Sequence, residues 1–429
     1  MTSSVSTRRN AFGTANPHAL ATILEASETR RIISATDIYD ISGIKLWASN
    51  QPVSAALQRK LLDRELREPL ETSLVAQDGV SPATLADAVR ALLAKMPPLA
   101  ILVGESREYL LGLVSQLNLH PVAQLLLTAA QTARPERFEH AVAAMVLNGA
   151  LMASDAGDDK AVRMAMLSGL LHDLGEMYIG PDHGEAEADR DLDFESYQQL
   201  VVHPHVGYLL VLQLTNYPPE VARAIAEHHE KLDGSGYPNA LQADDLSRWG
   251  RMLAVTEATL QALRSPYSHL LHASVALRAV PGEFDLHWVG KITAAASAQP
   301  PQAAVLERQE VEQRLAALDA VLNDAEEGVR LQAASADLPA HQGALTLAAF
   351  LLQRLRTGWN ESGLWNPESL ATADAAEVEA LEDELYFRLR GIKRSVLLRG
   401  GHLPEPYAGQ LLELCDSFAM GAGLQSDGG

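Results

Sequence analysis

Five histidines and one aspartate in the middle third of the chain have the residue types of a metal site. They are His140, His172, Asp173, His203, His228 and His229. The dipeptide His172-Asp173 follows an apolar run that we expect to be helical and to end at Gly175, so the pair should point into a core. A buried imidazole beside a buried carboxylate is unfavourable unless the two are paired or bind a metal ion. Taken alone, the dipeptide favours a structural His–Asp hydrogen bond over a metal site.

The other histidines also adjoin apolar helical patterns, which changes this balance. His140 precedes the apolar run Ala141–Met145, and His203 heads another apolar helix. His228-His229-Glu230 closes a helix that starts near Pro219. Imidazole and carboxylate ligands without thiolates suit iron, manganese or zinc. Two neighbouring ions of this kind polarise a phosphodiester and activate water for in-line attack at phosphorus.

The order and spacing of these pieces resemble the HD-GYP family, the branch of the HD phosphohydrolases that cleaves cyclic di-GMP. The resemblance spans residues 134–270. It rests on His140, His172-Asp173, His203-Pro204-x-x-Gly207, His228-His229-Glu230-x-x-Asp233-Gly234-x-Gly236-Tyr237-Pro238 and Arg251-Met252-Leu253-Ala254-Val255. It implies an all-helical HD-type phosphohydrolase domain with two or three divalent transition metals, usually iron or manganese. Five pieces in the family's order are specific, whereas a lone His-Asp dipeptide would mean little.

The resemblance also implies a role for each residue of the site. Asp173 would be catalytic and bridge two metals, and the terminal ligands would be His140, His172, His203, His228 and His229. Glu257 stands where the family has an aspartate ligand, and a glutamate can still coordinate. Glu136, one helical turn before His140, matches the glutamate of members with a third metal, although such a pair is equally consistent with a surface contact. The substrate-binding residues would be Asp233, Gly236, Tyr237, Pro238 and Arg264.

Three positions depart from the family pattern. Glu176 replaces a lysine that meets the scissile phosphate, which reverses an interaction of about 3 kcal/mol at ~5 Å in an effective dielectric of about 20. Glu176 would then bind metal or carry a proton as a second catalytic residue, or be a solvated helix-end glutamate. In Arg264-Ser265-Pro266-Tyr267-Ser268-His269 one family cation is missing, and Leu260 replaces an aspartate. The phosphate-binding half of the pattern is therefore reduced, while the metal-binding half is nearly complete.

Before the metal-site motifs, the sequence predicts two regions of different character. Residues 1–28 are polar and small, which predicts disorder. Residues 29–80 predict a small β/α module. In it, the strand-like runs Ile32–Ala35 and Ile44–Ala48 form a hairpin or small sheet, and a helix follows from Pro52 to about Leu66.

The rest of the chain is predicted to be helical. Residues 81–300 form the HD-GYP-like domain, with a helix that starts at Ser81-Pro82 and ends near Met96. Residues 301–429 form a C-terminal helical segment, because apolar residues recur there at helical spacing. Two such sets are Val311, Leu315, Leu318, Leu322 and Leu385, Leu389, Ile392, Val396. We expect these helices to pack onto the domain or onto a second copy of the chain as a homodimer.

Composition narrows the class of protein. The chain has 429 residues and a net charge of −21, from 34 basic and 55 acidic residues, which argues against an extended contact with DNA or RNA. A single cysteine, Cys415, excludes a disulfide or a cysteine-based zinc site within one chain. Residues 1–10 lack the apolar core of a signal peptide, and no apolar run reaches about 18 residues. We therefore expect a cytoplasmic protein that does not enter the membrane.

Three functions fit these observations. The leading prediction is a metal-dependent phosphodiesterase that hydrolyses cyclic di-GMP in bacterial second-messenger signalling. The second is a non-catalytic signalling module that keeps the fold and binds a ligand or a protein partner. The loss of the lysine at Glu176 favours this second function, whereas the retained histidines oppose it, because buried imidazoles need partners. The third is an HD hydrolase that acts on another phosphorylated nucleotide.

Overall fold

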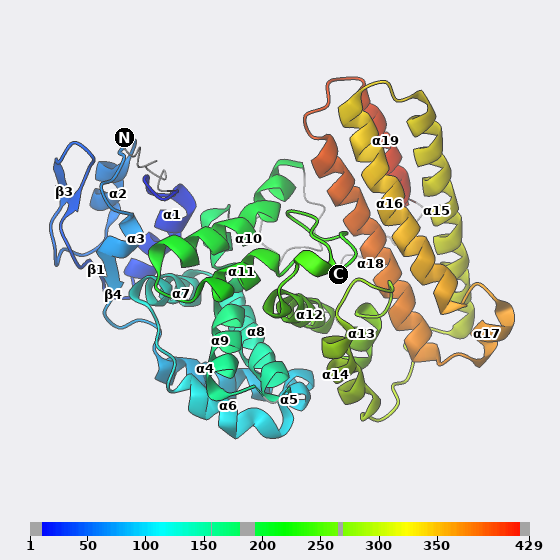
Figure 1. Cartoon of the computed structure of the whole chain (residues 1–429), viewed down its shortest axis with the longest axis horizontal. Helices are drawn as coiled ribbons and strands as arrows, with labels where there is room; N and C mark the ends of the chain where they lie inside the picture. Colours follow the sequence, from blue (N-terminus) through cyan, green and yellow to red (C-terminus); the bar gives the residue numbers. More distant parts are fainter. Residues whose placement is uncertain (1–10, 156, 181–193, 265–268, 421–429) are drawn as a thin grey trace, which may run out of the picture. The chain divides into compact units, whose positions relative to one another are not determined.

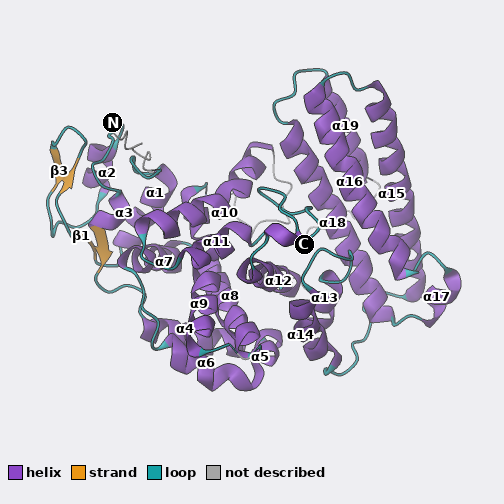
Figure 2. Ribbon diagram, viewed as in Figure 1, coloured by secondary structure: helices purple, strands orange, loops and turns teal. Residues whose placement is uncertain are grey.

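A computed structural model of the chain describes residues 11–155, 157–180, 194–264 and 269–420. These residues are mostly helical, and the strands among them lie in the N-terminal module (Figure 2), so the predicted mostly α fold is confirmed. In this part of the chain, no helix combines the length and the apolarity that a bilayer crossing requires.

The chain divides into two compact units. The first unit comprises Met1–Arg190, Gln199–His229 and Ser247–Leu253, and the second comprises Asp191–Gln198, Glu230–Leu246 and Ala254–Gly429. The N-terminal module and most of the HD-type helices thus share one unit. The C-terminal helices share the other with the segment that follows His229.

Helix α1 (Pro17–Ser27) opens the described part of the first unit, where the sequence predicted disorder. The Asn16 side chain accepts hydrogen bonds from the backbone N–H groups of His18 and Ala19 and so caps the helix. Leu20 and Ile23 are buried, and α1 packs against α7 (Pro121–Ala133). The prediction of disorder is therefore wrong for this stretch, because a few apolar residues at helical spacing find a tertiary partner.

The strands of the N-terminal module pair in two separate sheets. Strand β1 (Ile32–Ser34) pairs antiparallel with β4 (Leu74–Ala76), and β2 (Ile38–Tyr39) pairs antiparallel with β3 (Lys45–Trp47). The hairpin predicted between Ile32–Ala35 and Ile44–Ala48 does not form, whereas the alternative of a small sheet is confirmed, because the strands pair in two two-stranded sheets. A tighter turn forms between β2 and β3 instead. It is stabilised by the Asp40 carboxylate, which accepts the backbone N–H of Ile44 at 2.9 Å, and by Gly43, which adopts a φ of +85°.

The helix predicted to run from Pro52 to about Leu66 is shorter. It forms as α2 (Ala55–Leu61) and stops there, because Asp63 adopts a left-handed φ of +56°. The short helix α3 (Leu70–Ser73) then leads into β4.

Seven helical segments lead from the module towards the candidate site. They are α4 (Pro82–Lys95), α5 (Pro97–Val103), η1 (Gly104–Ser106), α6 (Arg107–Val114), α7, α8 (Pro135–Ala153) and α9 (Asp159–Leu171). The start of α4 is as predicted, and Ser81 and Thr84 form a reciprocal capping box there. Helices α8 and α9 lie side by side (Figure 1). A Cβ on Gly169 would lie 2.4 Å from the Ala144 carbonyl oxygen, so this close approach requires glycine.

The remaining helices near the site differ from the prediction in two details. Helix α9 ends at Leu171, and the His-Asp dipeptide lies on a 3-10 helix, η2 (His172–Tyr178), instead of on the α-helix itself. His203 lies inside α10 (Phe194–Leu214) and does not head it, because the helix continues through Pro204. Proline inside a helix removes the hydrogen bond of its missing N–H group, and its ring crowds the carbonyl of the residue four positions earlier. Helix α11 (Pro219–Glu227) ends at His228 as predicted.

The second unit is built around a bundle of four long helices. Its shorter elements are η5 (Ala243–Asp245), the later turns of α12 (Arg248–Leu263), α13 (Leu270–Ala276), α14 (Leu286–Ser297) and α17 (Pro367–Thr372). The long helices are α15 (Arg308–Ser335), α16 (Pro339–Ser362), α18 (Ala375–Gly400) and α19 (Tyr407–Met420), and they lie side by side (Figure 1).

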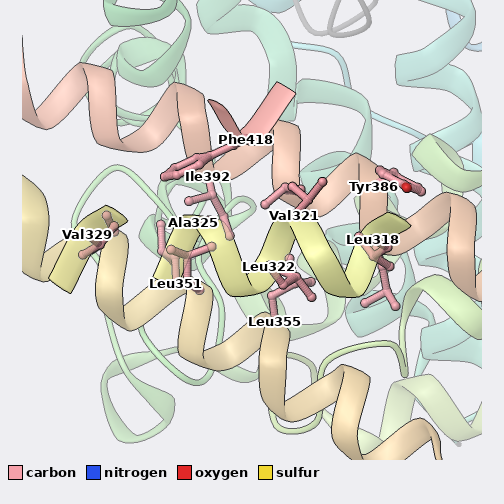
Figure 3. Close-up of a cluster of buried hydrophobic side chains, with 14 of the residues drawn as sticks. Leu318, Val321, Leu322, Ala325, Val329, Leu351, Leu355, Tyr386, Ile392 and Phe418 are labelled. Carbon is pink, nitrogen blue, oxygen red and sulfur yellow. The ribbon is translucent and has the colours of Figure 1, made fainter. Parts of the chain in front are cut away.

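The core of this bundle contains both sets of apolar residues that the sequence singled out. Leu322 of α15 lies beside Leu355 of α16, and Ala325 of α15 lies beside Ile392 of α18 (Figure 3), while Leu318 belongs to the same buried core. Leu385, Leu389 and Val396 of α18 are equally buried. The helical spacing of the C-terminal segment therefore predicted its buried face.

Candidate metal centre

Four elements of the first unit deliver the six residues that the sequence singled out. Helix α8 presents His140, η2 presents His172 and Asp173, α10 presents His203, and the end of α11 presents His228 and His229. Two glycines allow these elements to approach. A Cβ on Gly175 would lie 2.0 Å from the His203 carbonyl oxygen, and one on Gly207 would lie 2.9 Å from a methyl carbon of Ile225.

The histidines surround the carboxylate of Asp173. Its Oδ2 atom lies 3.2 Å from His172 Nε2 and 3.5 Å from His140 Nε2. Its Oδ1 atom lies 3.4 Å from Nε2 of both His203 and His228. The Nε2 atoms of His203 and His228 are themselves 3.1 Å apart. The structure thus brings together side chains from 89 residues of chain (140 to 228) around one carboxylate.

His229 belongs to the same group. Its ring nitrogen and the ligand atoms of Asp173, His203 and His228 all lie within 4.8 Å of one another. The centroid of its ring lies 4.1 Å from that of His228 and 5.1 Å from that of His203. A carboxylate and three imidazoles at this separation match the donor set of a divalent transition metal.

The backbone fixes which nitrogen of two of these rings faces the centre. Nδ1 of His172 lies 2.7 Å from the Gly169 carbonyl oxygen, and Nδ1 of His228 lies 2.6 Å from that of Ile225. A carbonyl oxygen can only accept, so Nδ1 carries the proton and Nε2 of the neutral ring carries a lone pair. These lone pairs face the Asp173 carboxylate, which is also an acceptor. A cation between them would satisfy both, and this second hydrogen bond is typical of metal-binding histidines.

Burial and mutual contact set the protonation of the group. Burial lowers the pKa of His228 to about 4, although its contact with Asp173 acts in the other direction. Burial would raise the pKa of the Asp173 carboxyl, but its contacts with His172, His203 and His228 hold it well below its usual value. A neutral imidazole and an ionised carboxylate are the forms that bind metal ions.

The two glutamates predicted as further ligands differ in their exposure. Glu136 on α8 is exposed to solvent, and it is not grouped with the histidines of the described residues. Glu257 is only 3% exposed and lies on the part of α12 that belongs to the second unit. Coordination by either glutamate remains a prediction.

Glu176 is buried in an ion pair. Its side chain is 2% exposed, and its Oε2 atom lies 2.8 Å from a guanidinium nitrogen of Arg137. The backbone oxygen of Glu176 accepts hydrogen bonds from Arg134 at 3.0 Å and Arg137 at 3.4 Å. The interpretation of Glu176 as a solvated helix-end glutamate is therefore wrong, because two arginines from the start of α8 enclose it.

Sequence reasoning missed these two arginines. Arg137 precedes His140 by three residues, which is one turn of α8, so the signal that could have revealed it is a cation on the ligand-bearing side of the helix. Together with Glu176, Arg134 and Arg137 form a group of two positive charges and one negative charge.

The predicted substrate-binding residues lie in the second unit. Asp233, Gly236, Tyr237 and Pro238 belong to the segment between α11 and η5, and Arg264 is exposed at the end of α12. The Asp233 carboxylate accepts hydrogen bonds from Arg354 Nε at 2.8 Å and from the Ser235 hydroxyl at 2.6 Å. Asp233 thus has partners within the protein. Contact of any of these residues with a substrate remains a prediction, and residues 265–268, which follow Arg264, lie outside the described residues.

Comparison with known proteins agrees with this geometry. Residues 123–283 match the family model described as HD domain. The chain is 33% identical to a cyclic di-GMP phosphodiesterase of Pseudomonas aeruginosa over 171 residues, which are 39% of this chain and 41% of the relative. It is 38% identical to a 3'3'-cGAMP-specific phosphodiesterase of Vibrio cholerae over 88 residues, which are 20% of this chain and 16% of the relative.

A third relative, a cyclic di-GMP phosphodiesterase response regulator of Xanthomonas campestris, is 32% identical over 109 residues, which are 25% of this chain and 28% of the relative. The chain thus spans less than half the length of each of these curated relatives. No solved structure matches the chain. The region matched to the HD domain contains the residues of the histidine–aspartate cluster.

Proposed function

We propose that the chain is a metal-dependent phosphodiesterase that hydrolyses a cyclic dinucleotide, with cyclic di-GMP as the substrate. One observation carries the proposal: the Nε2 lone pairs of His172 and His228 face the ionised carboxylate of Asp173. The names of the relatives, which act on cyclic di-GMP or 3'3'-cGAMP, support the substrate class.

The metal ligands would be His140, His172, Asp173, His203, His228, His229 and Glu257, and Asp173 would serve two ions. Glu136 would be a ligand of a third ion, if one binds. Iron or manganese suits this set, because it contains imidazoles and carboxylates and no thiolate. When bound, such ions polarise the phosphodiester and lower the pKa of water.

The positive charge for the phosphates would come from Arg137 and Arg134. Glu176 holds the Arg137 guanidinium by a charge-assisted hydrogen bond and so orients it beside the ligand-bearing turn of α8. We therefore assign Glu176 a positioning role in place of proton transfer. Gly236, Tyr237, Pro238 and Arg264 would contact the nucleotide.

The test begins with protein purified without air, loaded with manganese or iron and analysed for metal content. We expect cyclic di-GMP to be hydrolysed and Asp173→Ala to abolish both turnover and tight metal binding. Asp87→Ala is the control, because Asp87 is exposed and pairs with Arg90 on α4, a helix that carries none of the proposed metal ligands. A purified sample without transition metal, or full turnover in Asp173→Ala, would contradict the proposal.

The second candidate is a non-catalytic module that binds a cyclic dinucleotide. The buried Glu176 carboxylate favours it, since an anion beside a phosphate site weakens substrate binding. Tight metal and nucleotide binding without turnover of cyclic di-GMP, 3'3'-cGAMP or other phosphorylated nucleotides would select this candidate. Turnover of another nucleotide alone would select the third function.

Two further expectations accompany the proposal. A homodimer through the C-terminal helices would give twice the chain mass by light scattering, and a monomer at micromolar concentration would contradict it. A cytoplasmic location would be checked by cell fractionation.

A further inference from the structure

The segment Glu230–Leu246, which we call the glycine-rich loop, follows directly on from His228-His229 in the chain. It carries Tyr237 and Pro238, the residues proposed to contact the nucleotide. Within the loop, the buried Glu230 carboxylate accepts the backbone N–H groups of Asn239 at 2.7 Å and Leu241 at 2.9 Å. These hydrogen bonds fix the conformation of the loop. Its position depends on contacts with neighbouring elements.

One anchor is Arg354 of α16. Its Nε atom donates to Asp233 Oδ2 at 2.8 Å, and another guanidinium nitrogen donates to the Pro281 carbonyl oxygen. The partners Arg354 and Asp233 are 121 residues apart in sequence. The Asp233 side chain is only 10% exposed, so this pair is less screened by water than a surface pair.

The other anchor runs through Glu283 to Arg388 of α18. The buried Glu283 carboxylate lies 2.8 Å from Lys231 Nζ on one oxygen and 2.8 Å from Arg388 on the other. The backbone N–H of Leu232 also donates to the Glu283 carbonyl oxygen at 2.8 Å. Glu283 thus connects the first residues of the loop to the C-terminal bundle.

The turn that carries Glu283 is itself held tightly against α16. A Cβ on Gly358 of α16 would lie 2.1 Å from the Ala279 carbonyl oxygen, so only glycine permits this approach. Val280 and Trp359 belong to the same buried core as the bundle helices. Because the turn packs into the bundle core, Glu283 and the Pro281 carbonyl are fixed acceptors for the two arginines.

We propose that the C-terminal bundle positions the glycine-rich loop through Arg354 and Arg388, and thereby sets the affinity for the nucleotide. The catalytic consequence rests on the proposed function, whereas the structural one does not. Arg354 and Arg388 are positioning residues, since they act through Asp233 and Glu283. Loss of either anchor should raise the KM about tenfold and change kcat much less, because the loop carries residues proposed to bind the nucleotide and none of the proposed metal ligands.

The experiment compares Arg354→Gln and Arg388→Gln with Arg356→Gln in the full-length, metal-loaded protein. Arg356 is the matched control on the same helix, because its guanidinium pairs with Asp319 at 2.6 Å and Glu326 at 3.0 Å inside the bundle. Arg354→Lys is a second variant that keeps the charge and loses one of the two simultaneous contacts. The readouts are hydrogen–deuterium exchange of peptides from 230–246 and the separate KM and kcat for cyclic di-GMP.

We expect exchange in 230–246 to rise several-fold in Arg354→Gln and Arg388→Gln, less in Arg354→Lys, and not in Arg356→Gln. The KM should follow the same order. Unchanged exchange in both glutamine variants, an equal rise in Arg356→Gln, or faster exchange with an unchanged KM would overturn the proposal. If the wild-type protein has no turnover, the proposed function fails, and exchange together with the dissociation constant of cyclic di-GMP still decides this inference.

Discussion

Two buried carboxylates, Asp173 of the first unit and Glu283 of the second, have different partners. Asp173 faces imidazole nitrogens, two of which are held with a lone pair towards it. Glu283 faces side chains that carry a positive charge. Glu283 lies between Lys231 and Arg388.

The difference lies in the source of the positive charge that offsets each buried carboxylate. A buried ion is tolerated only when an opposite charge or several hydrogen bonds offset its lost hydration. For Glu283, the chain supplies that charge in its own guanidinium and ammonium groups. The cluster of the first unit depends on a cation from solution, so removal of that cation should affect the two units unequally.

The largest effect is expected on metal removal. Chelation should lower the free energy of unfolding of the first unit by about 3 to 4 kcal/mol if the metal was present at some 100 to 1,000 times its dissociation constant. Hydrogen–deuterium exchange should show the loss in peptides of α8, α9 and α11 and leave those of α15 to α19 unchanged. Equal destabilisation of both units, or none, would break the comparison.

The next largest effect concerns the compensated carboxylate. Arg388→Gln leaves Glu283 with less positive charge in a buried place and should destabilise the second unit by about 3 kcal/mol. Adding Glu283→Gln to the variant should recover part of this loss, because the uncompensated charge is then gone. Urea unfolding of the single and double variants measures both values, and a double variant less stable than the single one would contradict the interpretation.

A smaller effect is expected at the Arg137–Glu176 pair, where a buried carboxylate of the first unit is paired with an arginine. Glu176→Lys would place a third cation beside Arg134 and Arg137, so we expect kcat/KM for cyclic di-GMP to fall about tenfold, or about 1.4 kcal/mol. Metal content should stay constant. Glu139→Lys, at an exposed site on α8, is the control. A rise in activity would mean instead that Glu176 impairs this enzyme and that Arg137 does not serve the phosphate.

The smallest effect is a dependence on pH in the bundle. Burial raises the pKa of Glu382 to about 7, although Arg314 beside it acts in the opposite direction. Because the folded-state pKa exceeds the ordinary value of 4.5, the stabilising effect of its protonated form is present below pH 4.5 and is lost as the pH rises to about 7.

Glu382→Gln should remove this slope, so that it gains stability relative to the wild type between pH 5 and pH 8. Urea unfolding at both pH values measures the difference. Glu377→Gln, at an exposed ion pair, should show no such change. A constant difference between wild type and Glu382→Gln across this range would show that Glu382 stays ionised.

Much of the site could be read from the sequence because metal ligation demands particular residue types. Histidines that follow or precede apolar helical runs are expected to be buried, and a buried imidazole needs a hydrogen-bond partner or a metal ion. Several such histidines in the order typical of the HD-GYP family favour the metal ion. This reasoning brought His140, His172, Asp173, His203, His228 and His229 into one cluster. It also predicted the buried faces of α15 and α18, since helical spacing is a local property of the chain.

The ion-pair partners of individual charged residues could not be predicted from the sequence. The sequence did not reveal that the Asp233 carboxylate pairs with Arg354, 121 residues further along the chain. It also marked Glu176 as an anomaly without revealing Arg137 as its partner. An ion pair needs only two side chains in reach, and many pairs of residues in a charged chain satisfy that condition.

The sequence by itself determined the helical class, the donor set around Asp173 and the apolar faces of the C-terminal helices, because burial periodicity and ligand chemistry are written in residue type and spacing. Only the tertiary structure decided that Ile32–Ser34 pairs with Leu74–Ala76, that Glu176 is enclosed by arginines and that α16 and α18 anchor the glycine-rich loop. Each of these depends on which distant segments meet, and that is settled by packing of the whole unit and not by any local pattern.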